Sequence, residues 1–228
     1  MLIKNIEPII NVADDDVYYP SDDSYLILDY FSKYIKSNRF DSIPFEQVDM
    51  ILDLGTGSGI IAIYLALLEK RCDDFSPEIY ASDISDEALK IAHSNACKNH
   101  VSPQIQFIKS DLFQSFSSEL KNSFDIVIFN PPYLPSFYNV GGKSNKNLSE
   151  DRIWNGGPKG IEVILKFLDS AKKYITRDKK SYLYFISSSK ADLRQLNRTL
   201  SDLGYMNQVI EKKHVFFEDI YLNRAFLQ

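Results

Sequence analysis

Cysteine is scarce in this chain of 228 residues, which contains only Cys72 and Cys97. The two do not form a Cys-x-x-Cys pair, so we expect reduced thiols in a reducing compartment and no disulfide framework. The histidines His93, His100 and His214 are not spaced with cysteines or carboxylates as zinc ligands are. The sequence therefore predicts no metal site.

Long apolar runs are also missing, and the longest ones fall well short of the roughly 20 residues that cross a bilayer. The first ten residues are apolar only in patches and carry Lys4 and Glu7, so we predict no signal peptide. Together these absences predict a soluble cytoplasmic protein without a membrane partner.

An excess of positive charge is lacking as well. The chain has 26 Lys and Arg against 31 Asp and Glu, and its net charge is −5. A protein that binds nucleic acid by itself needs a basic face to neutralise phosphates, so a nucleic-acid partner is not expected. The hydrophobic content of 44% supports an ordinary globular core in one domain with additions.

Short apolar runs alternate with helical patterns from residue 48 onwards. The runs predict strands over 48–54, 78–82, 104–108, 124–129, 181–187, 206–211 and 220–227, and the helical patterns cover 60–68, 86–98, 158–175 and 190–203. This alternation predicts an α/β fold with a doubly wound, seven-stranded, mostly parallel sheet. The turn before the last strand has no room for a crossover helix, so that strand is predicted to be antiparallel.

The residues before this alternation differ in pattern. A helix is predicted from Ser21 or Asp22 to about Lys36, followed by a polar loop through Phe45. We therefore predict an N-terminal extension with one helix over 1–45 and a sheet domain over 46–228.

The segment Asn130-Pro131-Pro132-Tyr133 follows the apolar run 124–129. Two prolines cannot continue a sheet ladder, because neither has a backbone N–H. They hold the chain rigid at the strand end, where ligands bind in open α/β sheets. The Asn130 side chain and a neighbouring backbone carbonyl can then face a planar –NH2 group that Tyr133 covers.

A glycine-rich segment, Asp53-Leu54-Gly55-Thr56-Gly57-Ser58-Gly59, connects a strand to a helix. Its backbone can turn sharply and approach a ligand closely. The segment suits a methyl-donor loop, a nucleotide-phosphate loop or a plain tight turn. Asp53 favours the first, because a carboxylate repels a pyrophosphate and suits a ligand with a sulfonium and an ammonium group.

Two further carboxylates follow strands. Asp83 ends the second strand and can accept both hydroxyls of a ribose, or can serve as a negative charge at the N-terminus of the next helix. Asp111 follows the third strand, where its carboxylate or the Leu112 backbone N–H can meet an adenine. A solvated loop carboxylate is the alternative for Asp111.

The order of these motifs resembles class I S-adenosylmethionine-dependent methyltransferases. More narrowly, it resembles the HemK/PrmC-type N5-glutamine methyltransferases in their archaeal and eukaryotic, Mtq-like branch. The segment 17–24 is similar to that branch's VYEPAEDT motif, although Tyr19 replaces a Glu and Asp22 and Ser24 are conservative changes. Residues 51–63 are similar to its cofactor strand, loop and helix, and 154–160 to its W-x-GG-x-x-G segment.

The resemblance implies a Rossmann-like methyltransferase fold, with residues 46–228 as the methyltransferase domain, and S-adenosyl-L-methionine as the cofactor. The implied catalytic residues are Asn130, Pro131 and Tyr133. The implied cofactor-binding residues are Tyr18, Pro20, Ser24, Asp53, Gly55, Thr56, Gly57, Gly59, Asp83, Ile84, Asp111, Leu112 and Asn130.

The implied substrate is the Gln of the Gly-Gly-Gln loop of a translation release factor. Alternatives are an exocyclic amine of adenine or guanine in RNA or DNA, and a non-catalytic module that binds the donor. Residues 104–108 should form an unprotected sheet edge, and the resemblance implies a small zinc-binding activator subunit there. An edge covered by the chain's own loops is the alternative. The long loop 134–157 is the candidate lid.

Overall fold

The computed structural model describes residues 6–13, 17–136 and 153–227 of the chain. Its main sheet contains β3 (Met50–Leu54), β4 (Glu78–Asp83), β5 (Ile105–Lys109), β6 (Ile126–Phe129), β7 (Tyr182–Ser188), β8 (Tyr205–Val215) and β9 (Glu218–Leu227). The strand order is β5-β4-β3-β6-β7-β9-β8. The pairs from β5 to β7 are parallel, and β9 is antiparallel to both β7 and β8. The predicted fold is confirmed.

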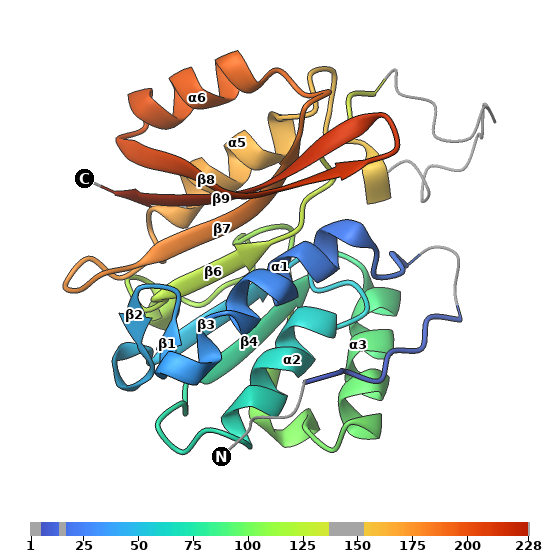
Figure 1. Cartoon of the computed structure of the whole chain (residues 1–228), viewed down its shortest axis with the longest axis vertical. Helices are drawn as coiled ribbons and strands as arrows, with labels where there is room; N and C mark the ends of the chain where they lie inside the picture. The colour runs from blue at the N-terminus through green and yellow to red at the C-terminus, as the bar shows by residue number, and fades with distance from the viewer. Residues whose placement is uncertain (1–5, 14–16, 137–152, 228) are drawn as a thin grey trace.

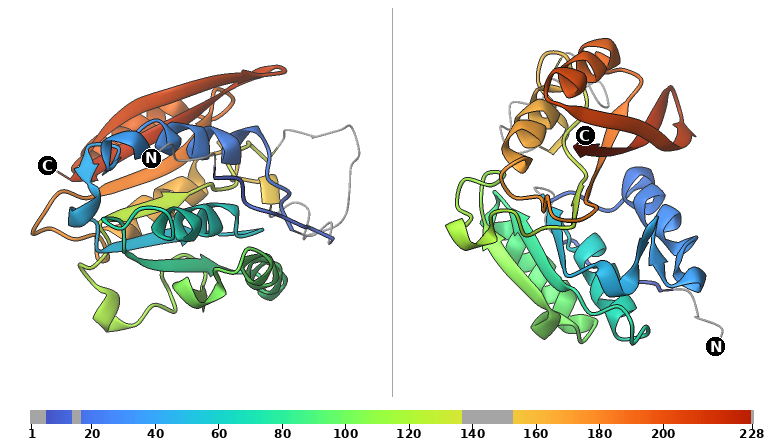
Figure 2. Two further views of the ribbon diagram at one scale, coloured as in Figure 1. Left: turned by 60° about the horizontal axis from the view of Figure 1, so that its bottom comes forward. Right: turned by 90° about the vertical axis from the view of Figure 1, so that its left-hand side faces the viewer.

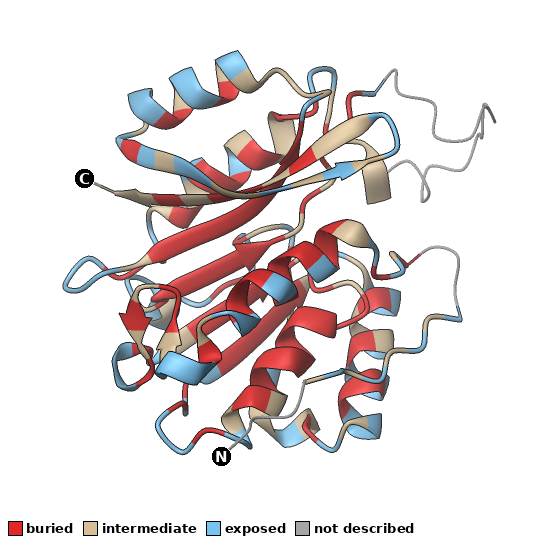
Figure 3. Ribbon diagram, in the orientation of Figure 1, coloured by how far each residue is buried: buried red, intermediate tan, exposed pale blue. Residues whose placement is uncertain are grey.

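Helices cover both faces of this sheet (Figures 1 and 2). One face carries α1 (Asp22–Ser32), α2 (Ile60–Glu69) and α3 (Asp86–Lys98), and the other carries α5 (Glu162–Ala171) and α6 (Leu193–Asp202). The central strands β6 and β7 are buried along their whole length (Figure 3). Strands covered on both faces read as continuous apolar runs, which is why the sequence signals them well.

Several predicted ends shift by a few residues. The helix predicted to reach Lys36 ends at Ser32 and is followed by a 3-10 turn over Ile35–Ser37. The helix predicted from Pro158 begins at Glu162, because Gly157 and Gly160 have φ of 99° and 71°, which no right-handed helix accepts.

The polar loop predicted after the first helix contains a small hairpin of β1 (Arg39–Phe40) and β2 (Ile43–Pro44). Its Phe40 and Ile43 are buried, and the Phe40 ring lies 4.1 Å from that of Phe31 on α1. The expectation of a plain loop was wrong, because these apolar side chains pack against core residues from other parts of the chain.

One cluster of buried hydrophobic residues runs from Leu26 to Ala225. The N-terminal helix therefore shares its core with the sheet, and the division at residue 45 stays a prediction. Among the residues that the structure describes, no helix has the length and apolar character to cross a membrane.

Candidate active site

A cavity of about 670 Å³ lies at the carboxyl ends of β3, β4 and β6. Its size is typical of small-molecule sites, and its position is where open α/β sheets bind ligands. Most predicted site residues line it, namely Tyr18, Ser24, Gly55, Thr56, Gly57, Asp83, Ile84, Asp111, Leu112, Asn130, Pro131 and Tyr133. Pro20, Asp53 and Gly59 are not part of its lining.

Asp53 lies beneath the glycine-rich loop and is 1% exposed. Its Oδ2 accepts hydrogen bonds from the Thr56 hydroxyl at 2.6 Å and the Ala62 backbone N–H at 3.1 Å. Burial raises the pKa of this carboxyl to about 7. These bonds give Asp53 a structural role, in which its carboxyl group holds the loop against the start of α2, and its contact with a cationic ligand stays a prediction.

The three glycines of the loop serve different purposes. A Cβ on Gly55 would meet the Phe129 ring at 2.8 Å, and one on Gly59 would meet Ala92 of α3 at 3.0 Å. Gly57, with φ of 53°, borders the cavity, and a Cβ there would meet only the Tyr18 Cβ, at 4.0 Å. Gly55 and Gly59 therefore permit close packing, whereas Gly57 leaves space for a ligand.

Asp83 lines the cavity next to the glycine-rich loop and binds two backbone groups there. Its two carboxylate oxygens accept the backbone N–H groups of Gly57 and Ser85, each at 2.9 Å. Burial raises the pKa of the Asp83 carboxyl, and these backbone donors oppose that rise. The cap of α3 is Ser85, whose hydroxyl accepts from the Ala88 N–H at 3.2 Å. Asp83 can face a ligand with its remaining lone pairs, and its bond to the Ser85 N–H also fits the alternative of a negative charge at the start of α3.

Ile84, Asp111 and Leu112 border the cavity beside Asp83. The Ile84 side chain is 54% exposed, although it is large and apolar. The Asp111 carboxylate accepts a hydrogen bond from Gln114 at 3.1 Å, and Leu112 adopts φ of 50°. An apolar side chain beside polar groups at the end of a strand suits a flat aromatic ligand such as an adenine.

The predicted N-terminal segment also lines the cavity and brings a residue, Asp23, whose role the sequence did not indicate. Asp23 is 2% exposed and accepts the Tyr18 hydroxyl at 2.6 Å and the Tyr133 hydroxyl at 3.0 Å. Burial and the Asp23 carboxylate raise the pKa of both tyrosines far above the ordinary value. The only sequence signal for Asp23 was its place between Asp22 and Ser24 in the segment similar to VYEPAEDT.

Asn130 ends β6 beside this network. Its Nδ2 donates to the Ser24 hydroxyl over 3.5 Å, while its buried Oδ1 has no hydrogen-bond partner among the described residues. A buried acceptor without a partner costs about 1–3 kcal/mol. Such a group in a ligand cavity is a sign of function, because a bound donor would satisfy it.

The segment 154–160 packs directly on the Asn-Pro-Pro-Tyr motif. The Leu134 N–H donates to the Trp154 carbonyl at 3.1 Å, and the Gly156 N–H donates back to the Leu134 carbonyl at 2.8 Å. Trp154 also lines the cavity, with its ring 5.0 Å from that of Tyr18. The sequence similarity had indicated this segment but not its contact with the motif. Residues 137–152 of the predicted lid lie outside the described part.

S-adenosylmethionine fits these groups. The Asp83 carboxylate suits the ribose hydroxyls, the side chain of Ile84 suits the adenine, and the open backbone at Gly57 leaves room for the rest of the molecule. The unpaired Asn130 Oδ1 remains available for an acceptor substrate.

Comparison with known proteins agrees with this geometry. Residues 37–146 match the family described as Methyltransferase small domain. A Methanocaldococcus jannaschii protein named as an N5-glutamine methyltransferase is 28% identical over 99% of both chains. The release factor glutamine methyltransferase of Chlorobaculum tepidum is 36% identical over 66% of this chain, which spans 49% of that relative.

Among solved structures, Mtq2 of E. cuniculi in its complex with Trm112 has a TM-score of 0.61 at 23% identity. The alignment covers 93% of this chain and 99% of the neighbour, which establishes the shared fold. The chain is therefore an S-adenosylmethionine-dependent methyltransferase, and its residues 37–146 match the methyltransferase small domain.

Proposed function

We propose that the protein methylates the side-chain amide nitrogen of the Gln in the Gly-Gly-Gln loop of a translation release factor. Two relatives are named as glutamine methyltransferases, and one of them as acting on release factors. The observation that carries the proposal is the buried, unpaired Oδ1 of Asn130 in the cavity wall. A primary amide supplies the N–H donor that this oxygen lacks. Such a substrate would place the enzyme in the cytoplasm.

An amide nitrogen is a weak nucleophile, because its lone pair is delocalised into the carbonyl group. Asn130 Oδ1 accepts one amide hydrogen and the Pro131 carbonyl accepts the other, so the nitrogen is held in one orientation. When bound, S-adenosylmethionine supplies an electrophilic methyl group. The two acceptors stabilise the positive charge that grows on the nitrogen during transfer, which favours the transition state over the ground state.

Tyr133 is held in place by a hydrogen bond as well as by its position in the motif. Its hydroxyl donates to Asp23, so the ring is fixed beside the motif instead of rotating freely. We assign the ring to the flat face of the substrate amide and Asp23 to positioning Tyr133 and Tyr18. No strong base is required beforehand, because the amide nitrogen gives up its proton after transfer.

We assign the donor-binding roles to the residues that border the cavity. Asp83 accepts the ribose hydroxyls, Ile84, Asp111 and Leu112 surround the adenine, and Gly57 faces the remainder of the donor. Tyr18 and Ser24 close the donor from the N-terminal side. Asp53, Gly59 and Pro20 lie outside the cavity lining, and their part in donor binding stays a prediction. Asp53 and Gly59 hold α2 against the loop and against α3.

A small partner protein is proposed at the free edge of β5. Within the described part of the chain this strand pairs only with β4, and its Gln106 is exposed along the edge. An edge without Pro or an inward charge can be paired by a strand of another chain. The similarity to Mtq2 in complex with Trm112 supports a small activator, and its binding of zinc is part of the proposal.

The test is transfer of a labelled methyl group from S-adenosylmethionine, with the candidate activator co-expressed. The acceptors are a release factor, the same factor with the Gln of its Gly-Gly-Gln loop changed to Ala, total RNA and DNA. Label on the intact factor alone supports the proposal. Label on nucleic acid with none on protein would replace it with exocyclic-amine methylation.

A further inference from the structure

The β8–β9 hairpin ends in two of the most exposed hydrophobic side chains of the described residues. Phe216 is 87% exposed and Phe217 is 85% exposed. They form the two-residue turn between Val215, the last residue of β8, and Glu218, the first residue of β9, which pair with each other. We call these two phenylalanines the hairpin tip.

The hairpin tip departs from ordinary turn chemistry. Two-residue hairpin turns prefer Asn, Asp and Gly, because the backbone must adopt positive φ. Phe216 adopts φ of 50°, which is unusual for a bulky side chain. Two aromatic residues here contribute nothing to the core and oppose the local preference. Rules of local structure are broken in this way mainly at functional positions.

The hairpin tip lies at the same end of the molecule as the cavity. β9 runs antiparallel to β7, so its first residues lie beside the carboxyl end of β7, where Glu218 accepts a hydrogen bond from Ser188. The Glu218 carboxylate also contributes to the raised pKa of Tyr133 in the Asn-Pro-Pro-Tyr motif. Figure 1 shows the tip of the hairpin on the side where α1 begins.

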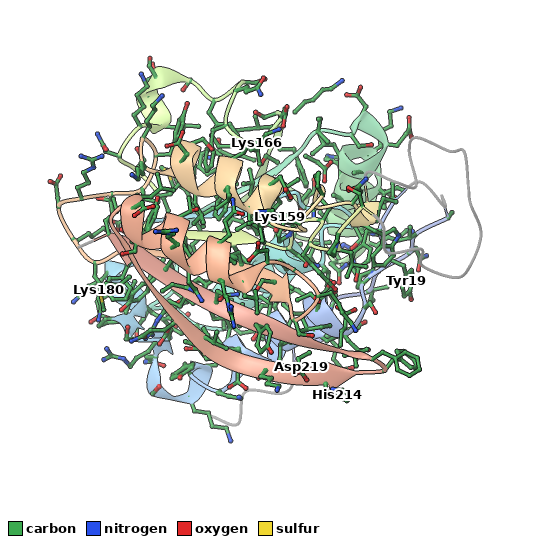
Figure 4. All side chains as sticks on the ribbon, turned by 90° about the horizontal axis from the view of Figure 1, so that it is seen from above. Tyr19, Lys159, Lys166, Lys180, His214 and Asp219 are labelled. Atoms are coloured by element: carbon green, nitrogen blue, oxygen red, sulfur yellow. The ribbon has the colours of Figure 1, made fainter. Side chains whose placement is uncertain are left out.

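α1 connects the hairpin to the residues that line the cavity through an ion pair. Lys213 of β8 forms an ion pair of 2.6 Å with Asp22, the neighbour of Asp23. Tyr19 precedes this helix and is 61% exposed. Figure 4 shows Tyr19 toward the same end of the molecule as His214 and Asp219, which flank the hairpin tip.

The charges around the hairpin tip are paired within the protein. Lys212 and His214 both contact Asp219, at 2.8 and 2.9 Å, and Lys213 is paired with Asp22. Lysine ammonium groups that are already paired with carboxylates offer little to a phosphate backbone. Exposed aromatic side chains among balanced charges are instead typical of protein interfaces, where Phe is enriched.

We propose that the hairpin tip is a docking site for the protein substrate, and that Phe216 and Phe217 pack on an apolar patch of the release factor beside its Gly-Gly-Gln loop. This inference rests on the proposed function. Docking at the hairpin tip holds the substrate protein while its Gln enters the cavity. It therefore governs recognition of the intact protein and not the methyl transfer itself.

The test compares steady-state methylation of an intact release factor by the wild type and by F216N/F217S, each with the activator present. Asn is chosen at position 216 because it tolerates positive φ. The control is M206S/V209S, which removes two exposed apolar side chains at the other end of the same hairpin. The measured quantities are KM for the release factor, kcat, the Kd of S-adenosylmethionine and the melting temperature.

We expect KM of F216N/F217S to rise at least tenfold, equivalent to about 1.4 kcal/mol, with the other three quantities unchanged. M206S/V209S should leave KM within about twofold of the wild type. An unchanged KM for F216N/F217S, or a loss confined to nucleic-acid acceptors, would overturn the docking site. If the wild type does not label the release factor at all, the proposed function fails and the docking site fails with it.

Discussion

Replacing Asn130 with Ala separates the chemistry of the site from its stability. The change removes the acceptor that we assign to the substrate amide. Loss of one oriented polar group of this kind lowers kcat by about 10²–10³-fold. Donor affinity should stay within about threefold, because the groups that we assign to the donor, Asp83 and Gly57 among them, are left in place.

The same change should not destabilise the protein much. The buried Oδ1 has no partner among the described residues, so its removal relieves a desolvation cost of about 1–3 kcal/mol. The hydrogen bond that Nδ2 loses spans 3.5 Å to Ser24 and is weak. These gains offset the packing lost with the side chain, and the melting temperature should stay within about 4 °C of the wild type.

Asn223 provides the matched control, because it is also a buried asparagine. It is 2% exposed, its Nδ2 donates to the Ser187 hydroxyl at 2.8 Å, and neither residue is part of the cavity lining. Asn223→Ala should lower the free energy of unfolding by about 1–3 kcal/mol and leave kcat unchanged. The assays are label transfer at saturating donor, donor binding by calorimetry and thermal melting. A kcat for Asn130→Ala within tenfold of the wild type, or an equal loss of donor affinity, would refute the assigned role.

Three further outcomes are expected. Because the folded-state pKa of Asp53 is raised from 3.8 to about 7, its contribution to stability is fully present below about pH 4 and is lost as pH rises through 7. From pH 5 to pH 8, the free energy of unfolding measured by chemical denaturation should fall more for the wild type than for Asp53→Asn. Equal changes in the two proteins would contradict this. Gly55→Ala forces a Cβ to 2.8 Å from the Phe129 ring at positive φ, so the free energy of unfolding should fall by about 1–3 kcal/mol, and Phe129→Leu should restore part of it. Tyr133→Phe removes the hydrogen bond to Asp23 but keeps the ring, so kcat should fall less than tenfold; a loss as large as that of Asn130→Ala would assign the role to the hydroxyl.

The alternation of strands and helices could be predicted from the sequence, because each central strand is buried on both faces. The run Ile126–Phe129 is apolar at every position, and it is followed at once by Asn130. The contacts of Asp23 could not be predicted from the sequence in this way. Its partners Tyr18 and Tyr133 are 5 and 110 residues away, and only folding brings the two hydroxyls onto one carboxylate.

Local sequence patterns also do not reveal the surroundings that decide the role of a side chain. Asp53 has the position of a ligand carboxylate in the sequence, and its burial and its bonds to Thr56 and to the start of α2 appear only in the folded chain. The stretch 39–44 reads as polar and irregular, yet Phe40 and Ile43 are drawn into the core by aromatic residues from distant segments.

By itself the sequence determined the fold class, the order of its elements and the strand ends where the ligand groups gather, because periodicity and glycine or proline placement act over a few residues. Only the tertiary structure decided which of those groups face the cavity, which are buried beneath it, and that Asn130 keeps an unpaired oxygen. It alone decided that Phe216 and Phe217 are exposed, at the turn that leads into β9 beside the carboxyl end of β7. Burial and hydrogen bonding depend on residues far apart in the chain, and no local pattern records them.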